Sequence, residues 1–208
     1  MKLDNYINYI KEIESKKLHP IIFVSGLAGS GKTTFTKKLV AEYKNAMRFE
    51  LDWYLKYSSI ERANRIKKAM DSGNKELIEK ECNPINHFDF NSFKRDLVKL
   101  QQGDKLFVQN AWNQQTGEKD ASFVLDFKGE KGLIICDADY VLHPEIISLS
   151  DFSIFLDVPK EEAFRRVVER DNHMKTPEQL ERKRLIVEMY DLPYLKAYKK
   201  NASLIING

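Results

Sequence analysis

Short apolar runs alternate with helix-like segments along most of the chain. Five of these runs are rich in β-branched and aromatic residues, as expected of strands, and they lie at residues 20–25, 46–51, 132–137, 151–158 and 202–208. The runs at 132–137 and 151–158 are largely apolar throughout, which is typical of strands buried on both faces of a sheet. The alternation predicts an α/β fold, with a five-stranded parallel sheet covered by helices on both faces.

Helical patterns fill most of the segments between these strands. They are expected at residues 1–19, 59–70, 74–82, 88–103, 143–150 and 160–171, and from residue 176 onward. In the first of these, one face of the helix collects Leu3, Tyr6, Ile7, Ile10 and Ile13. For the helix at 88–103 we expect Asn91 as the N-cap and Gly103 as the stop, and Pro193 is expected to interrupt the last helix.

Two further strand-like runs, "KLFVQNAW" and "ASFVLDF", enclose the polar stretch "NQQTGEKD". This arrangement predicts a β-hairpin at about 105–127, appended to the main sheet. The chain has no internal repeat, low-complexity segment or flexible linker, so residues 1–208 are expected to form a single domain.

Composition and charge narrow the range of partners. The 208 residues are 42% hydrophobic, and 34 basic residues face 31 acidic ones for a net charge of +3, so no global field favours nucleic acid or a membrane surface. Cys82 and Cys136 match neither a disulfide framework nor a zinc site, which indicates a reducing, cytoplasmic setting. The N-terminus lacks the apolar core of a signal peptide, and no run approaches the roughly 20 apolar residues of a membrane span.

The stretch "GLAGSGKTT" follows the first predicted strand and opens a helix. It matches GxxxxGK[ST], a loop whose glycines let backbone N–H groups and a helix N-terminus surround a phosphate. In such a loop Lys32 reaches the β- and γ-phosphates, and the Thr33 hydroxyl holds Mg²⁺. The nucleotide-binding residues predicted from the motif are Gly26, Leu27, Ala28, Gly29, Ser30, Gly31, Lys32, Thr33 and Thr34.

Three acidic residues stand at the ends of predicted parallel strands, namely Asp52, Asp137 and Asp157. Residues at these ends converge on the phosphate loop, although an Asp there is also commonly a turn or cap residue. Phosphoryl transfer needs Mg²⁺ and a carboxylate that orients or deprotonates the attacking hydroxyl. We therefore expect Asp137 to act on Mg²⁺, directly or through water, and Asp52 to be the base.

Cations gather at about residues 165–184, on both sides of a short polar loop. Arg166 and Arg170 are four positions apart on one helix face, so both can be aimed at one phosphate. Pairing with the glutamates of the same region is the alternative for each arginine. We expect a mobile lid here that excludes water from the phosphates, with Arg166 and Arg170 as its catalytic cations.

The order of these segments resembles the uridine kinase and phosphoribulokinase branch of the P-loop kinases. The resemblance rests on "GLAGSGKTT", "DWYLK", "NPINHFDF" before a helix ending in "LVKLQQG", the strand that closes on an acid, and "RRVVERD". It runs from about residue 21 to residue 208. It implies an enzyme that uses ATP and Mg²⁺ to phosphorylate a hydroxyl of a small molecule, such as a nucleoside, a sugar or a riboside.

The resemblance also implies roles for single residues. The proposed base of the family falls on Asp52, and the arginine motif places Arg166 and Arg170 in the lid. The residues that it implies at the acceptor are Tyr54, Asn83, Asn86, His87 and Asp89. Uridine kinases usually carry a His and an Arg on the hairpin, but "NAWNQQTGEK" has neither, and Trp112 is expected there as an apolar or stacking wall. The identity of the acceptor therefore stays open.

Other functions of a phosphate loop make different demands on the sequence. A GTP-dependent switch needs the guanine-reading motif N-K-x-D, and the nearest match, Asn74 to Leu77, lacks the acid. A P-loop ATPase or a nucleotide-binding regulatory protein acting on a protein partner remains the alternative. Such ATPases generally place a water-activating Glu after the metal-site Asp, where this chain has Ala138. The sequence gives no support for any particular oligomer.

Overall fold

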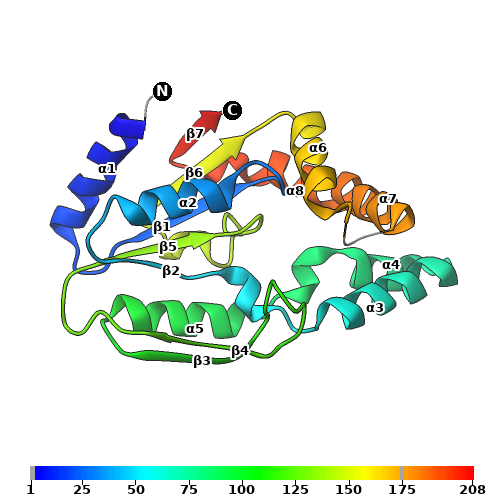
Figure 1. Cartoon of the computed structure of the whole chain (residues 1–208), viewed down its shortest axis with the longest axis horizontal. Coiled ribbons are helices and arrows are strands. Elements are labelled where there is room, and N and C mark those ends of the chain that lie inside the picture. The colour runs from blue at the N-terminus through cyan, green and yellow to red at the C-terminus, as the bar shows by residue number, and fades with distance from the viewer. Residues whose placement is uncertain (1–2, 174–175) are drawn as a thin grey trace.

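The computed structural model describes residues 3–173 and 176–208, and a parallel sheet lies at its centre (Figure 1). The strands lie in the order β2-β5-β1-β6-β7, and every neighbouring pair is parallel. Their bounds are β1 Ile21–Gly26, β2 Ala46–Arg48, β5 Leu133–Asp137, β6 Phe152–Asp157 and β7 Leu204–Asn207. The five-stranded parallel sheet expected from the sequence is confirmed.

Helices surround this sheet in the described part of the chain. They are α1 Leu3–Lys16, α2 Lys32–Ala41, α3 Ser59–Ser72, α4 Lys75–Cys82, α5 Phe90–Gln101, α6 Lys160–Asp171, α7 Pro177–Ile186 and α8 Leu192–Tyr198. A π-helical turn, Val187–Asp191, joins α7 to α8. Pro193 lies in the first turn of α8, so the expected interruption takes the form of this wide turn, just before a residue that lacks a backbone N–H.

The two faces of the sheet carry separate hydrophobic clusters, because successive strand residues point to opposite sides. On one face Ile22 and Val24 of β1 pack with Ile10 of α1 and Leu39 of α2. On the other face Phe23 joins a larger cluster, to which α5, α8 and the hairpin contribute. Both faces are covered, as predicted. The side chains of Leu3, Tyr6 and Ile7, expected on the apolar face of α1, lie outside the described side chains.

The predicted hairpin is confirmed as β3 Leu106–Ala111 paired antiparallel with β4 Ala121–Leu125. It lies beside α5, away from the main sheet (Figure 1). Phe123 of β4 stacks on Trp53 with ring centroids 4.2 Å apart, and the Trp112 backbone N–H donates to the Trp53 carbonyl oxygen at 3.2 Å. The hairpin therefore holds the segment that follows β2.

Two local predictions are wrong. The N-cap of α5 is Asp89, whose Oδ1 accepts from the Ser92 N–H at 3.0 Å, so Asn91 already lies within the first helical turn. The helix expected at 143–150 is only a 3₁₀ turn, Ile147–Leu149. That segment is too short to repay the cost of nucleating an α-helix before β6 begins.

The buried face of α5 is expected to contribute heavily to stability. Phe93 is fully buried and packs at 5.3 Å from the Phe49 ring, whereas Phe107 on β3 is 61% exposed. Replacing Phe93 by Ala should lower the free energy of unfolding by about 3–5 kcal/mol, because it leaves a cavity in the core. Urea denaturation measures this change. The matched variant Phe107→Ala should change it by less than about 0.5 kcal/mol, and equal losses in the two variants would contradict the assigned core.

Candidate active site

The phosphate loop connects β1 to α2, as the motif predicts. Gly29 and Gly31 have φ angles of +87° and +92°, values that side chains rarely allow. Gly31 is the N-cap of α2 and supplies no side-chain hydrogen bond to it, which leaves the first-turn N–H groups available to an anion. Lys32 Nζ folds back over the loop and donates to the carbonyl oxygens of Gly26 at 2.8 Å and Leu27 at 3.0 Å.

The loop packs directly against α6, the helix that begins the predicted lid. A Cβ atom on Gly29 would lie 2.1 Å from the Ala163 carbonyl oxygen, so only glycine fits there. Arg166 Nη1 lies 3.5 Å from the Gly29 carbonyl oxygen, and Arg166 Nε donates to Glu162 at 2.7 Å. The structure thus brings Arg166 to the loop.

Arg170, in contrast, donates from Nε to Asp171 at 2.7 Å. The expected lid corresponds to α6, α7 and the turn between them, of which residues 174–175 lie outside the described residues. Arg165 pairs with Glu162 and Glu169 on the exposed side of α6, in the way that the glutamate-pairing alternative anticipated. Both arginines are ion-paired, but they are placed differently, because Arg166 also lies at the loop, whereas no contact with the loop is seen for Arg170 among the described residues.

Asp137 ends β5 next to the loop, because β1 and β5 pair in register with Val24 opposite Asp137. Its Oδ2 lies 3.4 Å from Thr33 Oγ1. Two adjacent oxygen donors fit a magnesium ion, which typically takes one or two protein ligands and completes its shell with water and phosphate oxygens. Within the described residues, no group of three or more His, Cys, Asp or Glu side chains forms a metal site by itself.

Basic side chains neutralise several of the carboxylates at this edge of the sheet. Arg48, at the end of β2, contacts Asp137 at 2.9 Å and Glu50 at 3.1 Å. Lys32 contacts Asp139 at 2.5 Å. Arg48, Glu50 and Asp139 were not predicted from the sequence. The position of Asp139 two residues beyond Asp137, in a loop that follows a strand end, was the available signal.

Asp52 lies in the 3₁₀ helix Leu51–Tyr54 that follows β2. Burial raises the pKa of its carboxyl to about 7, and repulsion from Asp139 and Glu50 adds to that shift. Arg62 of α3 acts in the opposite direction. Asp52 is thus a carboxylate that takes up and releases a proton near neutral pH, which suits a general base.

Asp157 does not join this group, because it pairs with Lys199 beyond the end of β6. Tyr54 points into the core, where its hydroxyl donates to Asp96 at 3.0 Å. Trp112 lies between the hairpin and α3, with the Arg62 guanidinium 5.2 Å from its ring centroid. The strand-end acids are therefore divided, with Asp52 and Asp137 close enough to repel each other and Asp157 apart from them.

The segment "NPINHFDF" forms a turn between α4 and α5. Its four predicted acceptor residues lie in different environments. Asn83 caps that turn by accepting from the Ile85 N–H at 3.2 Å, and Asp89 caps α5. His87 is buried, at 4% exposure. Asn86 is exposed and donates from Nδ2 to the Lys80 carbonyl oxygen at 3.2 Å. The four residues expected together at an acceptor therefore do not share one surface.

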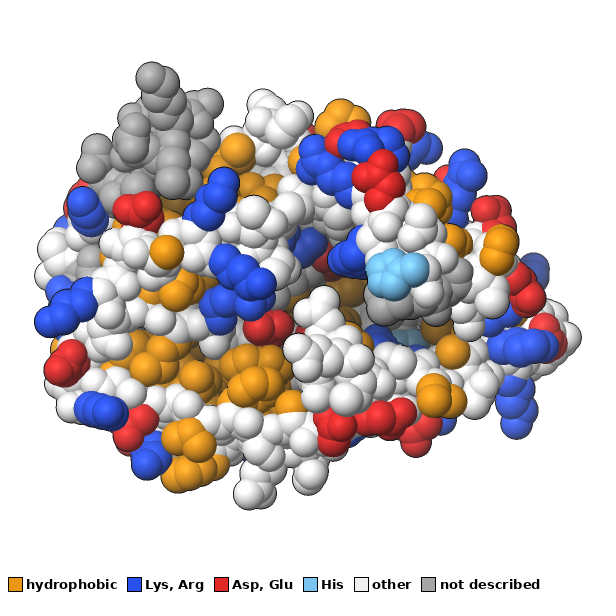
Figure 2. Space-filling model, viewed as in Figure 1, with side chains coloured by type: hydrophobic (Ala, Val, Ile, Leu, Met, Phe, Trp, Pro, Cys, Tyr) orange, Lys and Arg blue, Asp and Glu red, His pale blue; other side chains and the backbone are white. Residues whose placement is uncertain are grey.

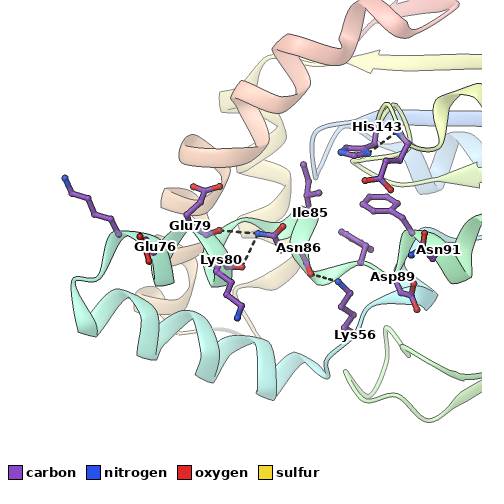
Figure 3. Close-up of a pocket in the computed structure, with 13 residues that line it drawn as sticks. Lys56, Glu76, Glu79, Lys80, Ile85, Asn86, Asp89, Asn91 and His143 are labelled. Carbon is purple, nitrogen blue, oxygen red and sulfur yellow. Dashed lines mark hydrogen bonds between the residues drawn. The ribbon is translucent and has the colours of Figure 1, made fainter.

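An open cavity of about 1070 Å³ lies on the outer side of this segment (Figure 3). Asn86 and Asp89 line it, while His143 faces them from the loop after β5 (Figure 3). A second cavity of about 260 Å³ lies between the phosphate loop and the helices α6 and α7. Figure 2, which has the same view as Figure 1, shows a hollow in the surface. The hollow lies between the part formed by α6 and α7 and the part formed by α3 and α4, and basic side chains lie on its walls.

The strand, glycine loop, helix and neighbouring acid define a P-loop protein. A family model described as an AAA domain matches residues 22–186, and the chain belongs to that family. None of the described helices is long and apolar enough to cross a membrane.

Several known proteins are similar over most of the chain. A uridine kinase of Ureaplasma parvum serovar 3 is 26% identical over 89% of this chain and 86% of its own. Phosphoribulokinase from Rhodobacter spheroides has a TM-score of 0.64 at 13% identity, over 91% of this chain and 70% of that one. A possible uridine kinase from Bacillus stearothermophilus has a TM-score of 0.61 at 17% identity, over 99% of this chain and all of that one. The resemblance seen in the sequence is confirmed for distant relatives and for the fold.

The contact between the phosphate loop and α6 gives a test at two glycines. Gly29→Ala should abolish tight binding of an ATP analogue and lower the melting temperature, because its Cβ would collide with the Ala163 carbonyl oxygen. Gly31→Ala meets nothing within 4 Å and should cost only the left-handed strain, about 1–2 kcal/mol. Fluorescence titration and thermal melting measure both effects. Equal behaviour of the two variants would contradict the close packing of the loop on α6.

The raised pKa of Asp52 also predicts how stability depends on pH. In the unfolded chain the carboxyl ionises near pH 4, whereas the folded protein holds the proton up to about pH 7, so Asp52 destabilises the fold increasingly across this range. Asp52→Asn should therefore change stability little at pH 4 and raise the free energy of unfolding by about 2 kcal/mol at pH 8. Asp157→Asn, which removes a carboxylate paired with Lys199, should give no such gain. Urea titrations at the two pH values decide the outcome.

Proposed function

We propose that this protein is a kinase that transfers the γ-phosphate of ATP to a hydroxyl group of a small molecule. The observation that carries the proposal is the placement of Asp52, whose pKa is raised to about 7, in the field of Asp139, which contacts Lys32 of the phosphate loop. A nucleotide-binding module without catalysis has no need of a proton acceptor tuned in this way. The similarity to a protein named uridine kinase supports the same reaction class.

Each group in the proposed mechanism has a distinct role. The loop N–H groups and Lys32 hold the triphosphate, and Arg166 stabilises charge on the transferring group from the side of α6. The Thr33 and Asp137 oxygens would hold Mg²⁺, Asp137 directly or through water, and the ion would neutralise phosphate charge there. The Asp52 carboxylate takes the proton of the acceptor hydroxyl as that oxygen attacks. Packing of α6 and α7 over the loop limits the entry of water.

The acceptor in this proposal is a nucleoside-like, sugar-like or riboside-like molecule. Trp112 supports this class, because its backbone bonds to the segment that carries Asp52 and the residue is half-buried, so that its ring can form an apolar wall. The hairpin brings no His or Arg to that position, so uridine itself has no specific support beyond the names of relatives. Among the residues first expected at the acceptor, the buried His87 stays a candidate for contact with the acceptor. Asn86 and Asp89 instead line the open cavity shown in Figure 3.

The second candidate function is an ATPase or regulatory protein that acts on a protein partner. The same phosphate loop and Asp137 would serve it, but Asp52 would then have no hydroxyl to deprotonate. An acceptor panel separates the two. A kinase forms ADP with a particular nucleoside, sugar or riboside above the rate with water, whereas an ATPase would hydrolyse ATP faster only when its partner is added.

Removing the base tests the mechanism. Asp52→Asn should lower the rate of phosphoryl transfer by about 10²–10⁴-fold while leaving affinity for ATP within about twofold, because the base acts on the acceptor and not on the nucleotide. Asp157→Asn serves as the control, since it removes an acid at the end of β6, another strand of the same sheet, and it should retain activity. Full transfer activity in Asp52→Asn with the true acceptor would refute the assignment of the base.

A further inference from the structure

Arg62, on α3, is a half-buried cation next to the proposed base. Its guanidinium lies over the Trp112 ring, and its Nη2 donates to Ser59 Oγ at 3.3 Å. Its Nε is shielded from solvent and has no hydrogen-bond partner. A buried donor left in this state costs free energy that a bound acceptor group would recover.

The other arginines of the site are already paired. Arg48 contacts Asp137 and Glu50, Arg166 contacts Glu162, and Arg170 contacts Asp171. Among the described residues Arg62 forms no ion pair, and the acid whose charge acts on it is Asp52. Burial lowers the pKa of Arg62, which is the sign of a cation that has lost water without gaining a full counter-charge.

His87 adds a second unsatisfied group in the same neighbourhood. It is 4% exposed, and its Nε2 has no hydrogen-bond partner. Burial lowers the pKa of His87, and the positive charge of Arg62 lowers it further, so the imidazole is neutral at pH 7. Arg62 therefore supplies the local positive charge, while His87 offers a neutral polar atom within the reach of that charge.

We propose that Arg62 binds an anionic group of the acceptor, so that the phosphorylated hydroxyl belongs to a compound that also carries a carboxylate or a phosphate. This inference rests on the proposed function and narrows its substrate class. A carboxylate or phosphate presents paired oxygen atoms that match the fork of a guanidinium. Bound at the Arg62 guanidinium, such a compound would present its hydroxyl close to Asp52. A neutral acceptor would leave the Arg62 charge uncompensated.

Two other roles for Arg62 make different predictions. If Arg62 served only to tune Asp52, its removal would raise the pKa seen in the rate profile and weaken neutral and anionic acceptors alike. If it bound the γ-phosphate of ATP, its removal would weaken binding of the nucleotide. A role toward an anionic acceptor predicts a loss confined to compounds that carry the charge.

Calorimetry with matched pairs of compounds tests the inference. The pairs are ribose with ribose 5-phosphate and glycerol with glycerate, each titrated into protein saturated with a non-hydrolysable ATP analogue, which fills the phosphate loop. Wild type should bind at least one anionic member more tightly than its neutral partner. Arg62→Gln should weaken that binding by about 10- to 100-fold, and Arg62→Lys should weaken it less because the charge remains. The two pairs distinguish a phosphate from a carboxylate as the recognised group.

The control is Lys68→Gln, which removes one positive charge from an exposed position on the same helix and should leave every affinity unchanged. Thermal melting checks that each variant is folded. The inference is overturned if neither anionic compound binds, if neutral and anionic members bind equally, or if Arg62→Gln weakens neutral and anionic members alike. It is also overturned if a separate titration of the ATP analogue shows that Arg62→Gln weakens only the nucleotide. Calorimetry measures binding, whereas the acceptor panel measures the formation of ADP. A panel that yields no ADP would therefore refute the proposed kinase activity, while the binding data would still decide the role of Arg62.

Discussion

The balance of charge at the carboxyl edge of the sheet is the constraint on which the rest of the site depends. Parallel strands deliver Glu50, Asp52, Asp137 and Asp139 to one small region, where they repel one another. Lys32 and Arg48 neutralise Asp139, Asp137 and Glu50 by direct contact. Among the described residues Asp52 has no ion-pair partner, and burial together with repulsion from Asp139 and Glu50 raises the pKa of its carboxyl. The remaining imbalance is therefore concentrated on the residue best placed to accept a proton.

Packing far from this edge keeps these charges in place. The register of β1 against β5 sets Asp137 beside the phosphate loop, and the contact of Gly29 with Ala163 sets α6 above it. The stack of Trp53 on Phe123 ties the 3₁₀ helix of Asp52 to the hairpin. Preorganised charges of this kind can stabilise a transition state without rearranging during the reaction. The ionised Asp52 carboxylate lowers the free energy of unfolding, and the hydrophobic clusters on both faces of the sheet offset that loss.

Regular patterns made the sheet, most helices and the phosphate loop predictable from the sequence, because periodicity and glycine spacing act over short distances. The site depends partly on contacts that no local pattern records. Tyr54 shares a segment with Asp52, yet the 3₁₀ turn directs its hydroxyl to Asp96 in the core. Arg62 reaches Trp112 only because α3 and the hairpin fold against each other, across 50 positions of chain between them. The helix predicted at 143–150 is absent for a related reason. The short connection between β5 and β6 leaves room only for the 3₁₀ turn Ile147–Leu149.

The most direct test of the central claim is the fate of the γ-phosphate. Protein incubated with γ-labelled ATP and a mixture of neutral and anionic hydroxyl compounds should place the label in an organic phosphate ester, and the rate should rise with pH through about 7 as Asp52 ionises. Recovery of the label only as inorganic phosphate, at a rate that does not depend on any hydroxyl compound, would contradict the account.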